Sequence, residues 1–176
     1  MKIGNRFGVH RVIEPKGVLP QAARVIDNTM EIYNNEILID VITLNIDSAS
    51  FTQLKEVNNS DKEKMKKMIL DIVGERGKMQ NPVTGSGGML IGVVKEIGPD
   101  FPNKNLKVGD RIATLVSLTL TPLKISKIKD IKLDTDQVDI EGQAILFASG
   151  IYSVIPSDMP EKLALAALDV AGAPAQ

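Results

Sequence analysis

Short apolar runs separated by turn-forming residues make up most of this 176-residue chain. The clearest run, residues 36–44, is rich in β-branched side chains and predicts a strand. Further strands are expected at residues 89–97, 111–117, 124–133 and 143–148, with turns at residues 98–100, 108–110 and 141–142. Residues 124–133 alternate apolar and basic side chains, which fits one exposed edge strand or two short strands. Many short strands with frequent turns predict a small β-barrel.

One helix is expected at residues 60–73, within this series of strands. Ser60 followed by Glu63 has the spacing of a capping box, in which each side chain satisfies a free backbone N–H of the first turn. Gly74 and Gly77 then predict its end. Five apolar residues follow helical spacing and predict a buried stripe: Met65, Met68, Ile69, Ile72 and Val73.

The end of the chain differs from the rest. Residues 160–171 predict a helix, with Asp158 as a possible cap, and a Gly/Pro-containing stretch follows to residue 176. We therefore expect residues 1–155 to form one mainly β domain with a helical insertion around residues 60–74. Residues 156–176 would be a connecting helix and hinge, and the chain would be a piece of a longer protein.

Composition excludes several classes of function. The net charge is −1 and basic residues are scattered among acidic ones, so nucleic acid is not an expected partner. There is no Cys, which excludes disulfides, thiolate nucleophiles and sulfur-based zinc sites. No apolar run approaches the roughly 18 residues of a membrane span, and no secretory signal is apparent. We expect a cytoplasmic protein without membrane contact.

Three glycine-containing blocks resemble the medium-chain dehydrogenases. They are Gly87-Gly-Met-Leu-Ile-Gly-Val-Val94, Ile97-Gly98 and Val108-Gly-Asp-Arg-Ile112, in the family's order and spacing. The resemblance implies the partly open, GroES-like β-barrel of that family's catalytic domain. It also implies a Rossmann domain, which this chain does not contain. The nearest dinucleotide fingerprint, Gly85-Ser-Gly-Gly-Met-Leu90, lacks the third glycine and leads into a predicted strand instead of a helix.

The chain departs from the zinc-dependent members of this family. Asp47 stands where they carry a metal-binding Cys, and Gly88 and Met89 stand where they carry a His-Glu pair. A catalytic zinc needs three protein ligands, and one Asp cannot supply them. We therefore predict no metal site.

A narrower resemblance covers the whole chain. Residues 10–20, 44–50, 78–92 and 166–176 are similar to the L-erythro-3,5-diaminohexanoate dehydrogenase family. This resemblance implies NAD- or NADP-dependent oxidative deamination of 3,5-diaminohexanoate to 5-amino-3-oxohexanoate in lysine fermentation. The partners would be this amino acid substrate and the protein's own Rossmann domain. We also expect a homo-oligomer, a dimer, because the late segments that cover the barrel in medium-chain dehydrogenases lie outside this chain.

The resemblance and the charge of an amine substrate select candidate site residues. Asp47 is the catalytic candidate, because a carboxylate 4 Å from an ammonium gains about 4 kcal/mol at an effective dielectric near 20. Ser48 is a candidate for cofactor binding. Candidates for substrate binding are Ser50, Thr84, Ser86, His10 and Arg11. Each has a structural alternative: Asp47 could cap a turn, the glycines of residues 85–88 could mark a close backbone approach, and a lone His is often structural.

Two other functions stay open from the sequence. Zinc-free quinone or enone reductases of the same superfamily also replace the zinc ligands. A free-standing, non-enzymatic barrel that serves as a binding module is the second alternative.

Overall fold

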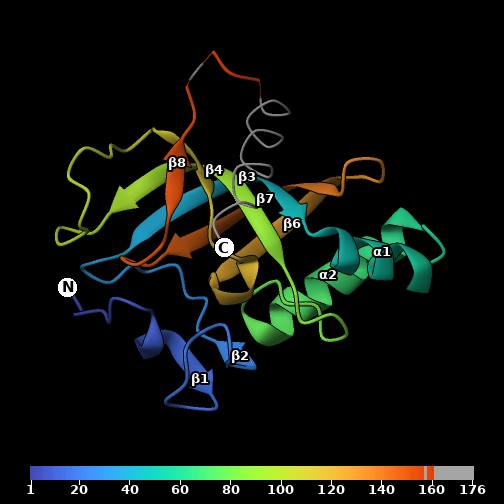
Figure 1. Cartoon of the computed structure of the whole chain (residues 1–176), viewed down its shortest axis with the longest axis horizontal. Coiled ribbons are helices and arrows are strands. Elements are labelled where there is room, and N and C mark those ends of the chain that lie inside the picture. Colours follow the sequence, from blue (N-terminus) through green and yellow to red (C-terminus); the bar gives the residue numbers. More distant parts are fainter. Residues whose placement is uncertain (157, 161–176) are drawn as a thin grey trace, which may run out of the picture.

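The computed structural model describes residues 1–156 and 158–160, which form a mainly β domain with two α-helices (Figure 1). A small sheet near the N-terminus pairs β1 (Val12–Glu14) with β2 (Val25–Ile26). The predicted helix at residues 160–171 and the following hinge lie outside the described residues, except for Pro160. No helix among the described residues is long and apolar enough to cross a membrane.

A six-stranded sheet forms most of the domain, in the order β6-β7-β3-β4-β5-β8. All of its pairings are antiparallel. The strands are β3 (Ile37–Ile46), β4 (Gly88–Ile97), β5 (Arg111–Thr114), β6 (Leu123–Lys132), β7 (Gln137–Leu146) and β8 (Tyr152–Val154). β3 lies between β4 and β7 and is buried along most of its length, which explains its density of Ile, Leu and Val.

Helices α1 (Ser48–Val57) and α2 (Lys62–Arg76) lie together at one side of the molecule, next to β6 (Figure 1). Their apolar residues join the main core with those of the large sheet. The helical members of this core are Phe51, Leu54, Met65, Ile69, Ile72 and Val73. Two short 3₁₀ helices, η1 (Val9–Arg11) and η2 (Leu118–Leu120), complete the described elements.

The structure confirms most predicted strands and corrects two. Residues 124–133 form a single outer strand, β6, one of the two alternatives that the sequence left open. The predicted turn at Glu141-Gly142 is wrong, because β7 continues through it; the turn into β7 lies at residues 133–136 instead, where Asp136 has a φ of 55°. The strand predicted for residues 111–117 ends at Thr114.

The predicted capping box of α2 is also wrong. Asp61 is the N-cap, and its side chain accepts hydrogen bonds from the backbone N–H groups of Glu63 and Lys64. Ser60 has a φ of 57° and belongs to the turn between the helices. The end of α2 is at Gly77, whose φ of 72° suits a glycine C-cap, whereas Gly74 lies inside the helix.

Candidate functional site

Asp47 lies at the junction of β3 and α1, where a largely buried strand is followed directly by a helix. Its Oδ1 accepts a hydrogen bond from the backbone N–H of Ser50 at 3.1 Å, so Asp47 caps α1. Asp and Ser are favoured at this position because a side-chain oxygen satisfies a free N–H of the first turn. Asp47 therefore has the structural role of a cap, the alternative that the sequence left open. A chemical role depends on its second carboxylate oxygen, Oδ2.

The loop from residue 77 to residue 87, between α2 and β4, folds over Asp47. Asn81 shapes this loop: its Oδ1 accepts from the backbone N–H of Val83 at 2.8 Å, and its own N–H donates to the carbonyl of Ser86 at 3.0 Å. The backbone N–H of Asp47 donates to the carbonyl of Gly87 at 3.2 Å. These contacts bring Thr84 and Ser86 against the start of α1.

Three hydroxyl groups and one carboxylate oxygen meet there, and we call them the Asp47 cluster: Asp47, Ser50, Thr84 and Ser86. Ser86 Oγ donates to Asp47 Oδ1 at 2.7 Å. Ser50 Oγ lies 2.7 Å from Ser86 Oγ and 2.7 Å from Thr84 Oγ1. Thr84 Oγ1 lies 3.1 Å from Ser86 Oγ. The structure thus brings together the catalytic candidate and three of the five substrate-binding candidates.

The second carboxylate oxygen of Asp47 differs from the first. Oδ2 is buried and has no hydrogen-bond partner among the described residues. Within residues 1–156 and 158–160, Asp47 makes no ion pair with Lys, Arg or His. A buried carboxylate oxygen without a donor is destabilising unless a further group satisfies it.

Glycines allow the loop and the strands to approach closely, as the sequence suggested. Gly88, the first residue of β4, has a φ of 125°, and a Cβ there would lie 2.0 Å from the carbonyl oxygen of Asn45. A Cβ on Gly87 would lie 2.6 Å from the carbonyl oxygen of Met79. These glycines place the loop within hydrogen-bond distance of Asp47.

His10 and Arg11 lie elsewhere. Both contact Glu36, which immediately precedes β3, whereas Asp47 immediately follows it. The 10-residue strand separates the two ends by about 30 Å. His10 Nε2 lies 2.9 Å from Glu36 Oε1, and the fully buried Arg11 donates from Nε and Nη2 to both carboxylate oxygens of Glu36 at 2.7 Å. The structure therefore does not bring these two substrate-binding candidates into the Asp47 cluster.

Glu36 is held as a carboxylate by this contact. Burial alone would raise the pKa of Glu36, but the hydrogen bonds from Arg11 and His10 and the charge of Arg11 outweigh burial and lower it. Arg11 also donates to the backbone carbonyls of Thr29 and Glu31. The Arg11–Glu36 pair therefore fastens the N-terminal segment to the large sheet.

Ser48, the cofactor-binding candidate, is exposed in the first turn of α1. The described residues do not fit a complete dinucleotide site: the sheet is antiparallel, and the stretch from Gly85 to Leu90 enters a strand instead of a helix. No group of three or more His, Cys, Asp or Glu residues in the described part of the chain could hold a metal ion.

The sequence did not single out Lys78, Asn81 or Gln53. Asn81 Nδ2 donates to Gln53 Oε1 at 2.8 Å and so ties the loop to α1. Lys78 is fully buried, and its Nζ donates to the carbonyls of Pro20 and Gln21 at 2.6 and 3.4 Å. Burial, with a smaller effect from the charge of Arg76, lowers the pKa of Lys78 to about 8. The Asn81-Pro82 pair could have indicated an ordered loop, but nothing local in the sequence marks a buried lysine.

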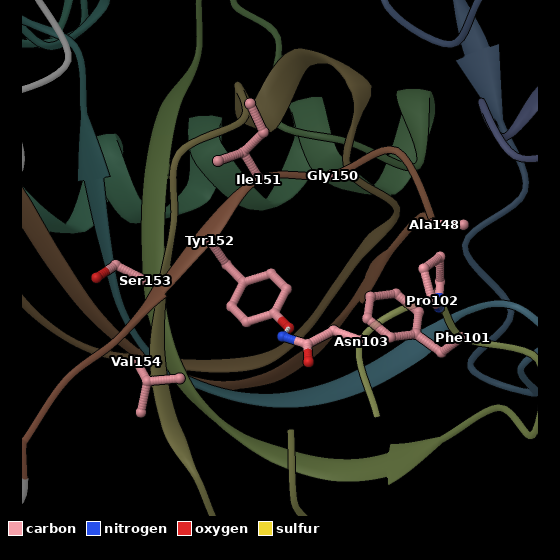
Figure 2. A pocket seen from close by; sticks show the side chains of 9 residues that line it. All are labelled: Phe101, Pro102, Asn103, Ala148, Gly150, Ile151, Tyr152, Ser153 and Val154. Carbon is pink, nitrogen blue, oxygen red and sulfur yellow. Dashed lines mark hydrogen bonds between the residues drawn. The ribbon is translucent and has the colours of Figure 1, made fainter. Parts of the chain in front are cut away.

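A separate hollow of about 470 Å³ lies beside β8. Figure 2 shows that Tyr152 and Asn103 face one another in it, and Asn103 Nδ2 donates to the Tyr152 hydroxyl at 2.7 Å. Its lining residues carry no charge and include none of the Asp47 cluster. The hollow offers no charged side chain that could pair with the ammonium or carboxylate groups of an amino acid substrate.

The fold and the cluster define a class of protein: a mainly antiparallel β domain that presents a carboxylate backed by hydroxyl groups. The sequence model of the L-erythro-3,5-diaminohexanoate dehydrogenase N-terminal domain matches residues 10–156, and the chain belongs to this family. It is 69% identical over 177 residues to an L-erythro-3,5-diaminohexanoate dehydrogenase of Fusobacterium nucleatum, covering 100% of this chain and 51% of that protein. It is 67% identical over 174 residues to the enzyme of the same name from Acetoanaerobium sticklandii, covering 98% of this chain and 51% of that protein. The chain thus spans about half the length of the curated relatives it matches.

Proposed function

We propose that the complete protein is an NAD- or NADP-dependent amine dehydrogenase that oxidatively deaminates L-erythro-3,5-diaminohexanoate in lysine fermentation. The name that both relatives carry supports this activity, at 69% and 67% identity. In this proposal, residues 1–155 are the GroES-like, partly open barrel that binds substrate, with a helical insertion around residues 60–74. Residues 156–176 lead to the Rossmann domain that binds the dinucleotide.

The observation that carries the site proposal is the unsatisfied Asp47 Oδ2. Its neighbours in the cluster are neutral donors, and all of them reach Oδ1 or each other. Oδ2 is therefore left to interact with a group that arrives from outside the described residues. A substrate with two ammonium groups supplies such a partner, and attraction between the two charges strengthens as water is excluded.

Asp47 would act on the ammonium that is lost. An ammonium cannot be oxidised until it loses a proton, because its nitrogen lone pair is occupied. Asp47 Oδ2 accepts that proton and frees the lone pair, while Ser86 and the α1 N-terminus keep the carboxylate in place through Oδ1. The nicotinamide ring supplies the hydride acceptor when bound, and the described residues contribute no step to that transfer.

The same observation argues against a quinone or enone reductase. Those substrates carry no cation, so they would leave the buried Oδ2 without a partner. Parallel assays of NAD reduction with 3,5-diaminohexanoate and of NADPH oxidation with quinones distinguish the two activities in the complete protein. If the complete protein turned over neither 3,5-diaminohexanoate nor quinones, the result would favour the non-enzymatic binding module.

Asp47→Asn tests the role of the carboxylate. Asn keeps the shape and is as good an N-cap as Asp, so the helix is retained while the charge and the basic oxygen are lost. We expect kcat/KM for 3,5-diaminohexanoate to fall about 10²–10⁴-fold, the range for a positioned acid or base, with little change in Tm.

Asp47→Ala is the matched control for capping. It removes both the charge and the cap, so it should lose the same activity and also about 1 kcal/mol of stability. Near-normal turnover of Asp47→Asn, together with a lowered Tm, would show that Asp47 is a capping residue only.

A further inference from the structure

We infer that the hydroxyls of Ser50, Thr84 and Ser86 form a proton relay between Asp47 and solvent. This inference rests on the proposed function, in which Asp47 takes a proton from the substrate ammonium. It changes the expected role of these three residues, from contacts to the substrate to groups that act behind the carboxylate.

The distances and the available hydrogens define an order along the relay. Ser86 Oγ uses its hydrogen on Asp47 Oδ1 at 2.7 Å, and Thr84 Oγ1 receives the backbone N–H of Ser86 at 3.4 Å. The two other short contacts, both 2.7 Å, are satisfied when Thr84 donates to Ser50 and Ser50 donates to Ser86. Two longer contacts, Thr84 Oγ1 to Ser86 Oγ at 3.1 Å and Ser50 Oγ to the Ser86 carbonyl at 3.3 Å, are the weaker alternatives. Every hydroxyl then donates once, and the chain is continuous from Thr84 to the carboxylate.

The three hydroxyls differ in burial, and the outer end of the chain is the exposed one. Ser50 is fully buried, Ser86 is half-buried, and Thr84 is exposed. Thr84 is therefore the member that can exchange a proton with water, while the inner members connect it to Asp47. A hydroxyl can accept one proton while it donates another, which suits it to pass a proton on.

The proton balance needs no further reactant. The substrate ammonium gives one proton to Asp47 Oδ2 and becomes a neutral amine. A half-turn of the neutral carboxyl group about Cβ–Cγ exchanges its two oxygens. The hydroxyls rotate so that Ser86 donates to Ser50, Ser50 to Thr84 and Thr84 to water, and the carboxyl proton then passes to Ser86 Oγ. Ser86 passes its own proton to Ser50, Ser50 passes one to Thr84, and Thr84 releases one to water. Asp47 is again a carboxylate, and the transfer itself leaves each hydroxyl donating toward Asp47 as before.

The test uses the complete protein with NAD and 3,5-diaminohexanoate in a single turnover, with proton release followed by a pH-indicator dye in a stopped-flow instrument. Thr84→Val keeps the shape of an exposed side chain and removes the hydroxyl. We expect it to slow proton release about 10-fold or more, with KM unchanged, and a small added buffer base should restore the rate. Thr84→Ser keeps the hydroxyl and should retain the wild-type rate. Thr135→Val, an exposed control in the turn before β7, should behave as wild type.

Ser50→Ala breaks the relay at its buried member. Thr84 Oγ1 lies 3.1 Å from Ser86 Oγ, so a longer direct step bypasses Ser50. We expect Ser50→Ala to slow proton release less than Thr84→Val, and buffer to restore it in the same way.

The outcomes separate this inference from the proposed function. Proton release by Thr84→Val at the wild-type rate would overturn the relay, and so would a loss of activity that buffer does not restore. Both results leave the role of Asp47 standing if Asp47→Asn is inactive. A fully active Asp47→Asn would overturn the proposed role of Asp47, and the relay with it. Absence of 3,5-diaminohexanoate turnover by the wild-type protein would overturn the proposed function itself.

Discussion

At the scale of single residues, Asp47 shows how one carboxylate can be both structural and chemical. Oδ1 caps α1 and receives Ser86, whereas Oδ2 is buried without a partner among the described residues. The sequence could predict that Asp47, Ser50, Thr84 and Ser86 belong to one site. The family resemblance covers Asp47 and Ser50 in residues 44–50, and Thr84 and Ser86 in residues 78–92. It could not place His10 and Arg11, because their distance from Asp47 depends on which end of β3 they contact.

Lys78 is a residue whose environment only the folded chain reveals. Its Nζ is buried against two backbone carbonyls, and no carboxylate pairs with it in the described structure. Burial lowers its pKa from 10.5 to about 8. Between these two values, the unfolded chain holds a proton that the folded chain has lost, so the free energy of unfolding rises with pH.

We therefore expect the wild type to gain on the order of 1–2 kcal/mol relative to Lys78→Met between pH 7.5 and pH 9.5. Denaturant unfolding of both proteins at the two pH values measures this difference. A difference that stays constant with pH would mean that the ammonium is solvated in the folded state.

At the scale of elements, the helices show where sequence reasoning succeeds and where it fails. Four members of the predicted α2 stripe are buried, namely Met65, Ile69, Ile72 and Val73, and the fifth, Met68, is partly buried against the same core. The helix α1 was missed because it carries only two large buried apolar side chains, Phe51 and Leu54, too few to give a clear helical period. The strand β7 was cut short because Gly142 suggested a turn, whereas in the sheet it allows a close approach to the Lys124 carbonyl.

The cap of α2 gives a prediction at this scale. Asp61→Ala removes a side chain that accepts from two backbone N–H groups, so we expect a loss of about 1 kcal/mol in the free energy of unfolding. Ser60→Gly should be neutral or slightly stabilising, because glycine adopts the positive φ of this position without strain. Urea unfolding of the two variants measures both changes. A larger loss of unfolding free energy in Ser60→Gly than in Asp61→Ala would instead support Ser60 as the cap, as in the predicted capping box.

At the scale of the whole molecule, the Arg11–Glu36 pair connects the N-terminal segment to the large sheet. Glu36→Gln would leave the buried guanidinium of Arg11 with only the partly exposed Asp27, at 3.5 Å, as an ionic partner, and breaking one side of a buried pair typically costs about 3–5 kcal/mol. We expect a loss of that order at neutral pH, measured by thermal or denaturant unfolding. The double variant Arg11→Met/Glu36→Gln should be more stable than Glu36→Gln alone, because no unpaired charge stays buried.

The pH dependence of the same pair has a defined sign. The pKa of Glu36 lies below its ordinary value of 4.5, so its contribution is complete above that value and is lost as the pH falls through the lower, folded-state pKa. Glu36→Gln should therefore unfold with a flatter acid dependence than the wild type. If the stability of the variant depended on acid pH as steeply as that of the wild type, carboxylates other than Glu36 would be responsible for acid unfolding.

Gly88 limits which sequences this backbone can accept over evolutionary time. Its φ is 125°, and any Cβ at this position would lie 2.0 Å from the Asn45 carbonyl oxygen, so there is no room for a side chain. A metal-binding side chain such as His at residue 88 would need this same space. Substitution of Gly88 by a metal ligand would consequently require the β3–β4 pairing to shift first. The geometry of this one glycine thus restricts residue 88 to glycine for as long as the backbone keeps its present course.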